Sequence, residues 1–166
     1  GGILLAADEQ GLTGLWFDGE KYYANHLSTD HRKGNLPALE KAMLWLDIYF
    51  SGEEPSFMPP IHMIGTDFQM SVWNILLQIP YGKTISYGEI AARIAAGKGL
   101  AKMSAQAVGG AVGHNNISIL VPCHRVVGKS GSLTGYAGGI DKKVALLKLE
   151  KVNMDVLFTP KRGTAL

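Results

Sequence analysis

Ile119-Leu-Val-Pro-Cys-His-Arg-Val-Val127 places a reactive triplet, Cys123, His124 and Arg125, inside an apolar run. A continuous apolar run of this length is typical of a buried strand, so we expect an extended segment in the core. Burial of the three polar side chains costs free energy unless each finds a partner. A free cysteine is often only a small buried hydrophobe, but that interpretation leaves His124 and Arg125 unexplained. The pattern therefore favours a functional site.

The composition limits the classes of protein that this chain can belong to. Its 166 residues are 46% hydrophobic, which is enough for a core in one or two small domains. Cys123 is the single cysteine, which excludes an intrachain disulfide and a zinc site built from several cysteines. No apolar run reaches the roughly 18 residues of a membrane-spanning helix. We expect a monomeric cytoplasmic protein without a metal or cofactor, and, because the chain begins with Gly1, a natural N-terminus outside this sequence.

The charges are unevenly distributed along the chain. Residues 1–65 carry four Lys and Arg against nine Asp and Glu, whereas residues 66–166 carry twelve against five. A basic C-terminal part predicts a polyanionic partner for that part. Ordinary solvated surface charge is the alternative interpretation.

The N-terminal part reads as strands followed by one helix. Apolar runs at residues 3–7 and 12–17, separated by turn residues, predict a β-hairpin, and Tyr22-Tyr23 is a candidate third strand. Asn35 as cap and Pro37 in the first turn predict a helix that ends at Ser51-Gly52. Its expected buried face comprises Leu39, Met43, Leu46 and Phe50. A Pro-rich stretch at residues 55–60 indicates a linker, so we predict domains at 1–63 and 64–166.

The C-terminal part carries clear helix signals. Thr66-Asp-Phe-Gln69 and Ser86-Tyr-Gly-Glu89 are capping boxes, and a third helix rich in Ala and Gly is expected from Ser104 to about Val112. Helix, glycine-containing turn and small-residue helix form the outline of a helix-turn-helix. Asp141 is expected to cap a last helix that ends near Glu150.

Pro122-Cys-His-Arg-Val126 resembles the signature of the 6-O-alkylguanine-DNA alkyltransferases. The resemblance is strong over residues 66–150 and looser before them. It implies an α+β fold, in which a small ribonuclease H-like N-terminal α/β domain precedes a mostly helical, winged-helix-like DNA-binding and catalytic domain with a helix-turn-helix. Further segments match the family pattern in the same order: Phe68-Gln69, Val72-Trp73, Ile79–Gly82, Ser86-Tyr87, Ala107–Ala111, Asn115, Gly135-Tyr136 and Gly138-Gly139.

The resemblance implies direct-reversal DNA repair by a methylated-DNA–protein-cysteine S-methyltransferase (EC 2.1.1.63). The alkyl group of 6-O-alkylguanine, and by extension of 4-O-alkylthymine, would move irreversibly from a flipped-out base of duplex DNA to Cys123, once per molecule. His124 would take the thiol proton through a water, and Glu150 would orient the imidazole. Asn115 would brace the turn before the cysteine. Tyr87 would donate a proton to the departing guanine oxygen and crowd the DNA backbone.

The resemblance also implies a DNA-binding surface and an alkyl pocket. Arg125 would tie segments of the chain together as well as contact DNA. Lys83, Lys98 and Lys129 are further candidates for phosphate contacts. The expected DNA contacts are Tyr87, Lys102, Ser104, Ala105, Gln106, Gly109 and Arg125, and the expected pocket lining is Val126, Tyr136, Ala137, Gly138 and Gly139.

Gln106 is the clearest departure from the family pattern, because an arginine usually stands there and fills the space left by the flipped base. Glutamine can hydrogen-bond an orphaned base but lacks the planar cation. We still expect Gln106 to intercalate, with weaker binding to duplex DNA. Asn116 and Ser118 stand where prolines are frequent, so we expect a less rigid turn before Cys123.

Local geometry constrains this mechanism. Adjacent side chains of a regular extended segment point to opposite faces. Contact between the Cys123 thiol and His124 therefore requires a bend at Pro122-Cys123 or a bridging water. An imidazole held by a carboxylate is one established way to activate a thiol.

Three functions compete at this stage. Besides repair by alkyl transfer, the chain could be a non-catalytic alkylated-DNA-binding protein, or a Cys-His hydrolase or redox sensor. Relatives that bind the lesion without repair lack the acceptor cysteine, whereas Cys123 is present here. A redox sensor would call for a resolving cysteine, which the sequence does not contain.

Overall fold

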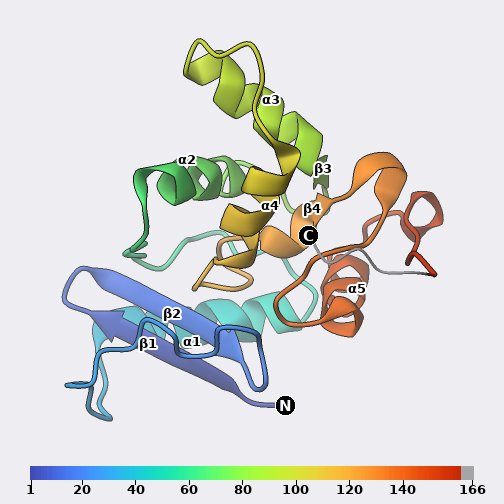
Figure 1. Cartoon of the computed structure of the whole chain (residues 1–166). Helices are drawn as coiled ribbons and strands as arrows, with labels where there is room; N and C mark the ends of the chain where they lie inside the picture. Colours follow the sequence, from blue (N-terminus) through green and yellow to red (C-terminus); the bar gives the residue numbers. More distant parts are fainter. Residues whose placement is uncertain (162–166) are drawn as a thin grey trace.

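Figure 1 shows a computed structural model of the chain, which describes residues 1–161. An N-terminal hairpin and helix α1 lie together on one side of the molecule, and helices α2, α3 and α4 lie on the other. Within residues 1–161, no helix combines the length and the apolar character needed to cross a membrane. The elements are β1 (Ile3–Asp8), β2 (Gly11–Phe17), α1 (Pro37–Phe50), α2 (Asp67–Leu76), β3 (Ile85–Ser86), α3 (Tyr87–Gly97), α4 (Ala105–Gly113), β4 (Val126–Val127) and α5 (Ile140–Leu149), with short 3-10 turns at Cys123–Arg125, Lys129–Gly131 and Met154–Val156.

The predicted hairpin is confirmed, but the third strand is wrong. Strands β1 and β2 pair antiparallel, and the Asp8 carboxylate accepts hydrogen bonds from the amides of Gln10 and Gly11 in the turn. Residues 21–26 instead form consecutive turns, with φ of 64° at Tyr22 and 53° at Ala24. Left-handed backbone of this kind is incompatible with a strand.

Helix α1 buries a different face from the predicted one. Met43 and Phe50 are 48% and 45% exposed, whereas Ala42, Trp45 and Tyr49 are buried along with Leu46. The helix is apolar on most of its circumference, so periodicity alone allows two neighbouring stripes. Its start also lies one residue later than predicted, because Leu36 is the N-cap residue.

The predicted capping boxes of α2 and α3 are both confirmed. Thr66 Oγ1 accepts from the Gln69 amide at 3.2 Å, and Gln69 Oε1 accepts from the Thr66 amide at 3.0 Å. The reciprocal pair between Ser86 and Glu89 starts α3. These local contacts fix where the helices begin, and α2, α3 and α4 then pack against one another.

Hairpin β1-β2 is joined directly to the segment that precedes Cys123. The Leu15 amide donates to Asn116 O at 2.8 Å, and the Ser118 amide donates to Leu15 O at 3.0 Å. Glu20, just beyond β2, accepts from the Phe17 amide at 2.8 Å and from Ser118 Oγ at 2.7 Å. One hydrophobic core cluster contains residues of the hairpin, of α1 and of the Cys123 segment. The N-terminal part therefore packs against the segment that precedes Cys123.

We predict that Glu20→Gln stabilises the protein at neutral and higher pH. Burial raises the pKa of Glu20 above its usual 4.5, so the folded state binds its proton more readily than the unfolded state does. Stability then falls as pH rises through the raised pKa. Glutamine can accept from the Phe17 amide and donate to Ser118 Oγ without a charge. Thermal unfolding at pH 8 should show a midpoint about 2–4 °C higher, equivalent to about 1 kcal/mol.

Glu9→Gln is the matched control, because Glu9 is an exposed carboxylate of the β1-β2 turn. It should leave the midpoint unchanged at every pH. A Glu20→Gln midpoint at or below that of the unaltered protein at pH 8 would contradict the prediction.

Candidate active site

The Cys123 segment is bent and not a continuous strand, which corrects the expectation for Ile119–Val127. Residues Cys123–Arg125 form a 3-10 turn after Pro122, whose φ and ψ are −82° and 65°, and the strand β4 begins only at Val126. Ile119 has a φ of 70°, which costs a β-branched residue about 1–2 kcal/mol. A bend at Pro122-Cys123, one of the two ways in which His124 could reach the thiol, is therefore present.

Asn115 holds this bent segment together. Its Nδ2 donates to Val121 O at 2.8 Å and to Cys123 Sγ at 3.2 Å, and its Oδ1 accepts from the Ile117 amide at 3.0 Å. Asn115 is itself buried. An amide donor aimed at sulfur favours the thiolate over the thiol. The predicted brace of the turn thus also contacts the reactive atom.

The Cys123 thiol is held neutral by its surroundings. It is 4% exposed, and burial raises its pKa to about 11, although the Asn115 hydrogen bond acts in the opposite direction. The Lys143 ammonium, also buried, donates to Val126 O and Thr134 O, and burial lowers the pKa of this lysine to about 8. Because a neutral thiol is a poor nucleophile, Cys123 needs a base in its site.

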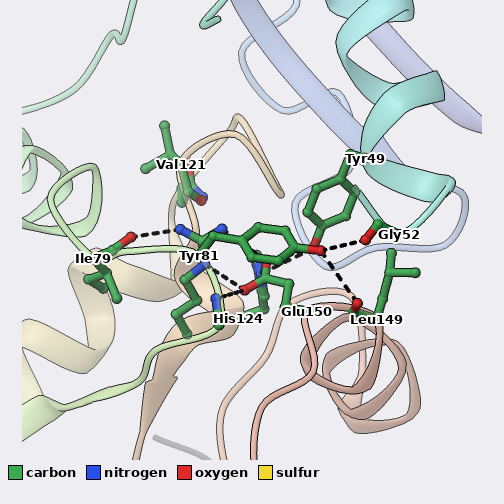
Figure 2. A network of polar contacts seen from close by, with 11 residues as sticks. Tyr49, Gly52, Ile79, Tyr81, Val121, His124, Leu149 and Glu150 are labelled. Atoms are coloured by element: carbon green, nitrogen blue, oxygen red, sulfur yellow. Dashed lines mark hydrogen bonds and ion pairs between the residues drawn. The ribbon is translucent and has the colours of Figure 1, made fainter. Parts of the chain in front are cut away.

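His124 and Glu150 form the pair that can supply this base (Figure 2). His124 Nε2 lies 2.7 Å from Glu150 Oε1, and both side chains are fully buried. The carboxylate can only accept, so Nε2 carries the hydrogen. Nδ1 has no hydrogen-bond partner within residues 1–161, which leaves its lone pair as the basic position. Burial lowers the pKa of His124 while Glu150 acts to raise it, so the imidazole is neutral at pH 7.

Arg125 neutralises the same carboxylate. Its Nε donates to Glu150 Oε2 and its Nη2 to Oε1, both at 2.9 Å, and Nη1 donates to Ile79 O at 2.7 Å. Burial alone would raise the pKa of Glu150, but hydrogen bonds and charge from His124 and Arg125 lower it to about 2. The structure supports the expected tie between segments. Arg125 is 8% exposed and its guanidinium is hydrogen-bonded inside the fold, whereas its expected contact with DNA stays a prediction.

Tyr87 and Tyr136 flank the thiol. The Tyr87 hydroxyl lies 3.3 Å from both Thr134 O and Gly135 O, and burial, with a further contribution from Cys123, raises its pKa. Burial and Cys123 raise the pKa of Tyr136 in the same way. Both phenols are therefore protonated at neutral pH and can act as donors.

Of the other predicted pocket residues, Val126 lies in β4 and the remaining three lie along the turn that leads into α5. Val126 is buried, Ala137 and Gly138 are half-buried, and Gly139 is exposed at the N-cap of α5 with a φ of 92°. A Cβ at Gly138 would lie 2.7 Å from the Tyr136 ring and 3.3 Å from that of Phe17. Glycine at position 138 therefore lets this turn pack closely against Tyr136.

The start of α4 presents the predicted DNA-binding residues to solvent. Lys102, Ser104, Ala105 and Gln106 are all exposed. Gly109 is buried on the inner side of the helix, and its contact with DNA stays a prediction. The lysines proposed for phosphate contacts, Lys83, Lys98, Lys102 and Lys129, are exposed as well.

Comparison with known proteins shows the family of this chain. The model of the 6-O-methylguanine DNA methyltransferase DNA binding domain matches residues 67–152, and that of the ribonuclease-like domain of the same proteins matches residues 1–63. The chain belongs to the 6-O-methylguanine DNA methyltransferase family. The resemblance stated from the sequence and its fold class are thereby confirmed, whereas the boundary between residues 63 and 64 stays a prediction.

Individual family members are similar to this chain over most of its length. A methylated-DNA–protein-cysteine methyltransferase of Haemophilus influenzae is 41% identical over 92% of this chain and 82% of its own length. One from Methanosarcina acetivorans is 47% identical over 90% of this chain and 92% of its own length. The crystal structure of Mycobacterium tuberculosis OGT in complex with DNA superposes with a TM-score of 0.76 at 47% identity, covering 90% of this chain and 86% of that one.

Two residues of the site were not predicted from the sequence. Tyr49 of α1 donates to Glu150 Oε1 at 2.7 Å, and Lys143 of α5 supports the segment after Cys123. Lys143 stands in helical register with Leu146, Leu147 and Glu150 on the buried side of α5, so a lysine in an apolar stripe was the available signal. The signal for Tyr49 was weaker, namely a tyrosine four residues after Trp45 in a second apolar stripe.

We predict that Glu150→Gln lowers the free energy of unfolding at pH 7 by about 3–5 kcal/mol, because Arg125 is left buried without a counter-charge. The pKa of Glu150 lies at about 2, below its usual 4.5. Its stabilisation is therefore present above pH 4.5 and is lost as pH falls toward 2. Urea unfolding between pH 7 and pH 3 should show a shallower loss of stability with acid in the variant.

Glu53→Gln removes an exposed carboxylate and serves as the control. It should reproduce both the stability and the acid dependence of the unaltered protein. Equal stability of the two variants at pH 7 would show that the buried pair is not the dominant ionic interaction.

Proposed function

We propose that this chain repairs DNA by transferring the alkyl group of 6-O-alkylguanine irreversibly to Cys123, as expected from the sequence. The observation that carries the proposal is the arrangement of one buried thiol, the Asn115 amide on its sulfur and a His124–Glu150 pair, in a member of this family. The relatives of Haemophilus influenzae and Methanosarcina acetivorans are methylated-DNA–protein-cysteine methyltransferases, and Mycobacterium tuberculosis OGT has been crystallised in complex with DNA.

The chemistry needs one proton removed and one supplied. His124 Nδ1 takes the thiol proton by way of a water, while Glu150 and Arg125 hold the imidazole in place. The thiolate sulfur then attacks the alkyl carbon, the S–C bond forms, the C–O6 bond breaks, and its electron pair passes to guanine. Tyr87 donates the proton that neutralises guanine and regains one from the imidazolium. The thioether is stable, so each molecule acts once.

The lesion reaches Cys123 as a flipped-out base. The O6 atom of a stacked guanine faces its partner base, so an enzyme that acts on it must extrude the nucleotide. The start of α4 would enter the duplex, with Gln106 in the space left by the base and Lys102, Ser104 and Ala105 at the backbone. Val126, Tyr136, Ala137, Gly138 and Gly139 would line the pocket for the alkyl group. 4-O-Alkylthymine presents a comparable O-alkyl group and is the second expected substrate.

The setting of this activity follows from its chemistry. A thiol acceptor has to stay reduced and has to meet DNA, which fits the cytoplasmic location expected from the single cysteine. All the catalytic groups come from one chain, which fits action as a monomer.

We predict a stoichiometric gain of one methyl group on Cys123. Incubation with duplex DNA containing 6-O-methylguanine should add about 14 Da to the intact protein, and peptide mapping should place the addition on Cys123. The same duplex with unmodified guanine should add nothing. Cys123→Ser should still bind the damaged duplex but accept no methyl group.

The outcomes of this experiment separate the competing functions. Binding to damaged DNA without a mass gain would identify a non-catalytic lesion-binding protein. Removal of the methyl group by Cys123→Ser would show that the acceptor is wrongly assigned.

We predict that Gln106→Ala lowers the rate of methyl transfer from duplex DNA about tenfold, an effect of about 1.4 kcal/mol, because nothing then braces the gap left by the extruded base. Transfer from a single-stranded oligonucleotide should be unchanged, since a single strand leaves no gap. Gln10→Ala, an exposed substitution in the hairpin turn, is the matched control. Equal losses on single and double strands would count against intercalation by Gln106.

A further inference from the structure

Tyr49 connects the N-terminal part of the chain to the catalytic carboxylate (Figure 2). It lies in the last turn of α1, and its hydroxyl donates to Glu150 Oε1 at 2.7 Å across 101 residues of sequence. The same hydroxyl lies 3.4 Å from His124 Nε2. Tyr49 is 0% exposed, so no solvent competes for this contact. The hydroxyl therefore touches both members of the pair that supplies the base.

The position of this hydroxyl is fixed by aromatic packing. The Tyr49 ring stacks on Trp45 with centroids 5.0 Å apart at 11°, and meets Tyr81 edge-on at 6.2 Å. Such contacts restrict the ring to one orientation. Helix α1 thus determines where the donor is presented to Glu150.

Glu150 Oε1 is shared between three donors. His124 Nε2, Tyr49 Oη and Arg125 Nη2 approach it at 2.7, 2.7 and 2.9 Å. Each further donor spreads the charge of the carboxylate and weakens its pull on the imidazole hydrogen. Burial and the neighbouring Glu150 charge raise the pKa of Tyr49, so the phenol stays protonated and serves only as a donor.

We propose that Tyr49 is a positioning residue for alkyl transfer, which holds Glu150 Oε1 in place and moderates its pull on the imidazole, so that His124 stays neutral with its basic lone pair on Nδ1. The N-terminal part of the chain then contributes directly to the chemistry at Cys123. This role of Tyr49 rests on the proposed alkyl transfer. Tyr49 acts through His124 and does not touch the substrate.

The charged and titratable groups around His124 set the sign of the expected pH effect. Glu150 favours the imidazolium, whereas burial, Arg125 and Lys143 disfavour it. The Cys123 thiol is neutral at pH 7, and Tyr49 moderates the influence of Glu150. Loss of the Tyr49 hydroxyl makes Glu150 a stronger acceptor, which raises the pKa of His124. The base is then protonated at a higher pH.

We predict that Tyr49→Phe lowers the first-order rate of methyl transfer within the DNA complex about tenfold at pH 7, or about 1.4 kcal/mol of barrier. The acidic limb of the rate profile should also move to higher pH. The dissociation constant for damaged duplex should stay within about twofold, because Tyr49 lies away from the exposed start of α4. Rates would be measured by rapid-quench mass spectrometry between pH 5 and pH 9.

Tyr23→Phe is the matched control, since it removes one hydroxyl from an exposed ring of the N-terminal part. It should leave rate, pH profile and thermal midpoint unchanged. 3-Fluorotyrosine introduced at Tyr49 keeps the ring and strengthens the donor, so its acidic limb should move to lower pH. This second variant keeps the test valid if Tyr49→Phe folds poorly.

Two results would overturn the role of Tyr49. One is a Tyr49→Phe rate and acidic limb equal to those of the unaltered protein. The other is a rate loss without movement of the limb in either variant, which would mean that Tyr49 is only structural. Failure of the unaltered protein to accept a methyl group would instead reject the proposed function itself.

Discussion

A single buried carboxylate organises this site. Glu150 accepts from the Gly82 amide as well as from Tyr49, His124 and Arg125, and these donors come from three separate parts of the sequence. A charge in a dry interior is tolerable only when it is neutralised and fully hydrogen-bonded, so the Glu150 carboxylate requires all of these donors. The C-terminal end of α5, the loop before β3, the Cys123 turn and α1 are therefore held at fixed distances.

Cys123 is in consequence a nucleophile that cannot react until its proton is removed. The thiol is buried and neutral, with a pKa of about 11, although the Asn115 amide donates to its sulfur and the charge of Lys143 favours the thiolate. Removal of its proton requires a neutral base, and burial keeps His124 neutral against the pull of Glu150. The ionic pair thus does not charge the imidazole; it orients it. A protein that reacts once benefits from such restraint, because a permanently ionised thiolate would be consumed by other electrophiles.

Local signals in the sequence predicted local structure well. The capping boxes at Thr66 and Ser86 are satisfied by residues three positions away, so the sequence alone contains both partners. No strand forms at Ile119, whose φ is 70°. The hydrogen bonds that hold its neighbours Ile117, Ser118 and Val121 come from Asn115 and the hairpin, and none of these contacts is visible in an apolar run. Tyr49 could not be placed at the site, because its partner is 101 residues away and α1 has two apolar stripes. The roles of Cys123, His124 and Glu150 were predicted from the resemblance of the motif to a family, and not from the periodicity of apolar residues.

The uneven charge of the chain also acquires a physical meaning from this arrangement. An N-terminal part with nine acids and four basic residues is a poor surface for phosphates, and its structural contacts are made with the back of the Cys123 segment. Repulsion of DNA from this side and attraction to the lysine-bearing side would orient the molecule before contact. The acidic part contacts the site from the side of the hairpin through Leu15, Glu20 and Tyr49, and it leaves exposed the start of α4, which we propose as the DNA-contacting surface. Orientation by charge and positioning by Tyr49 are thus two consequences of the same placement of the N-terminal part.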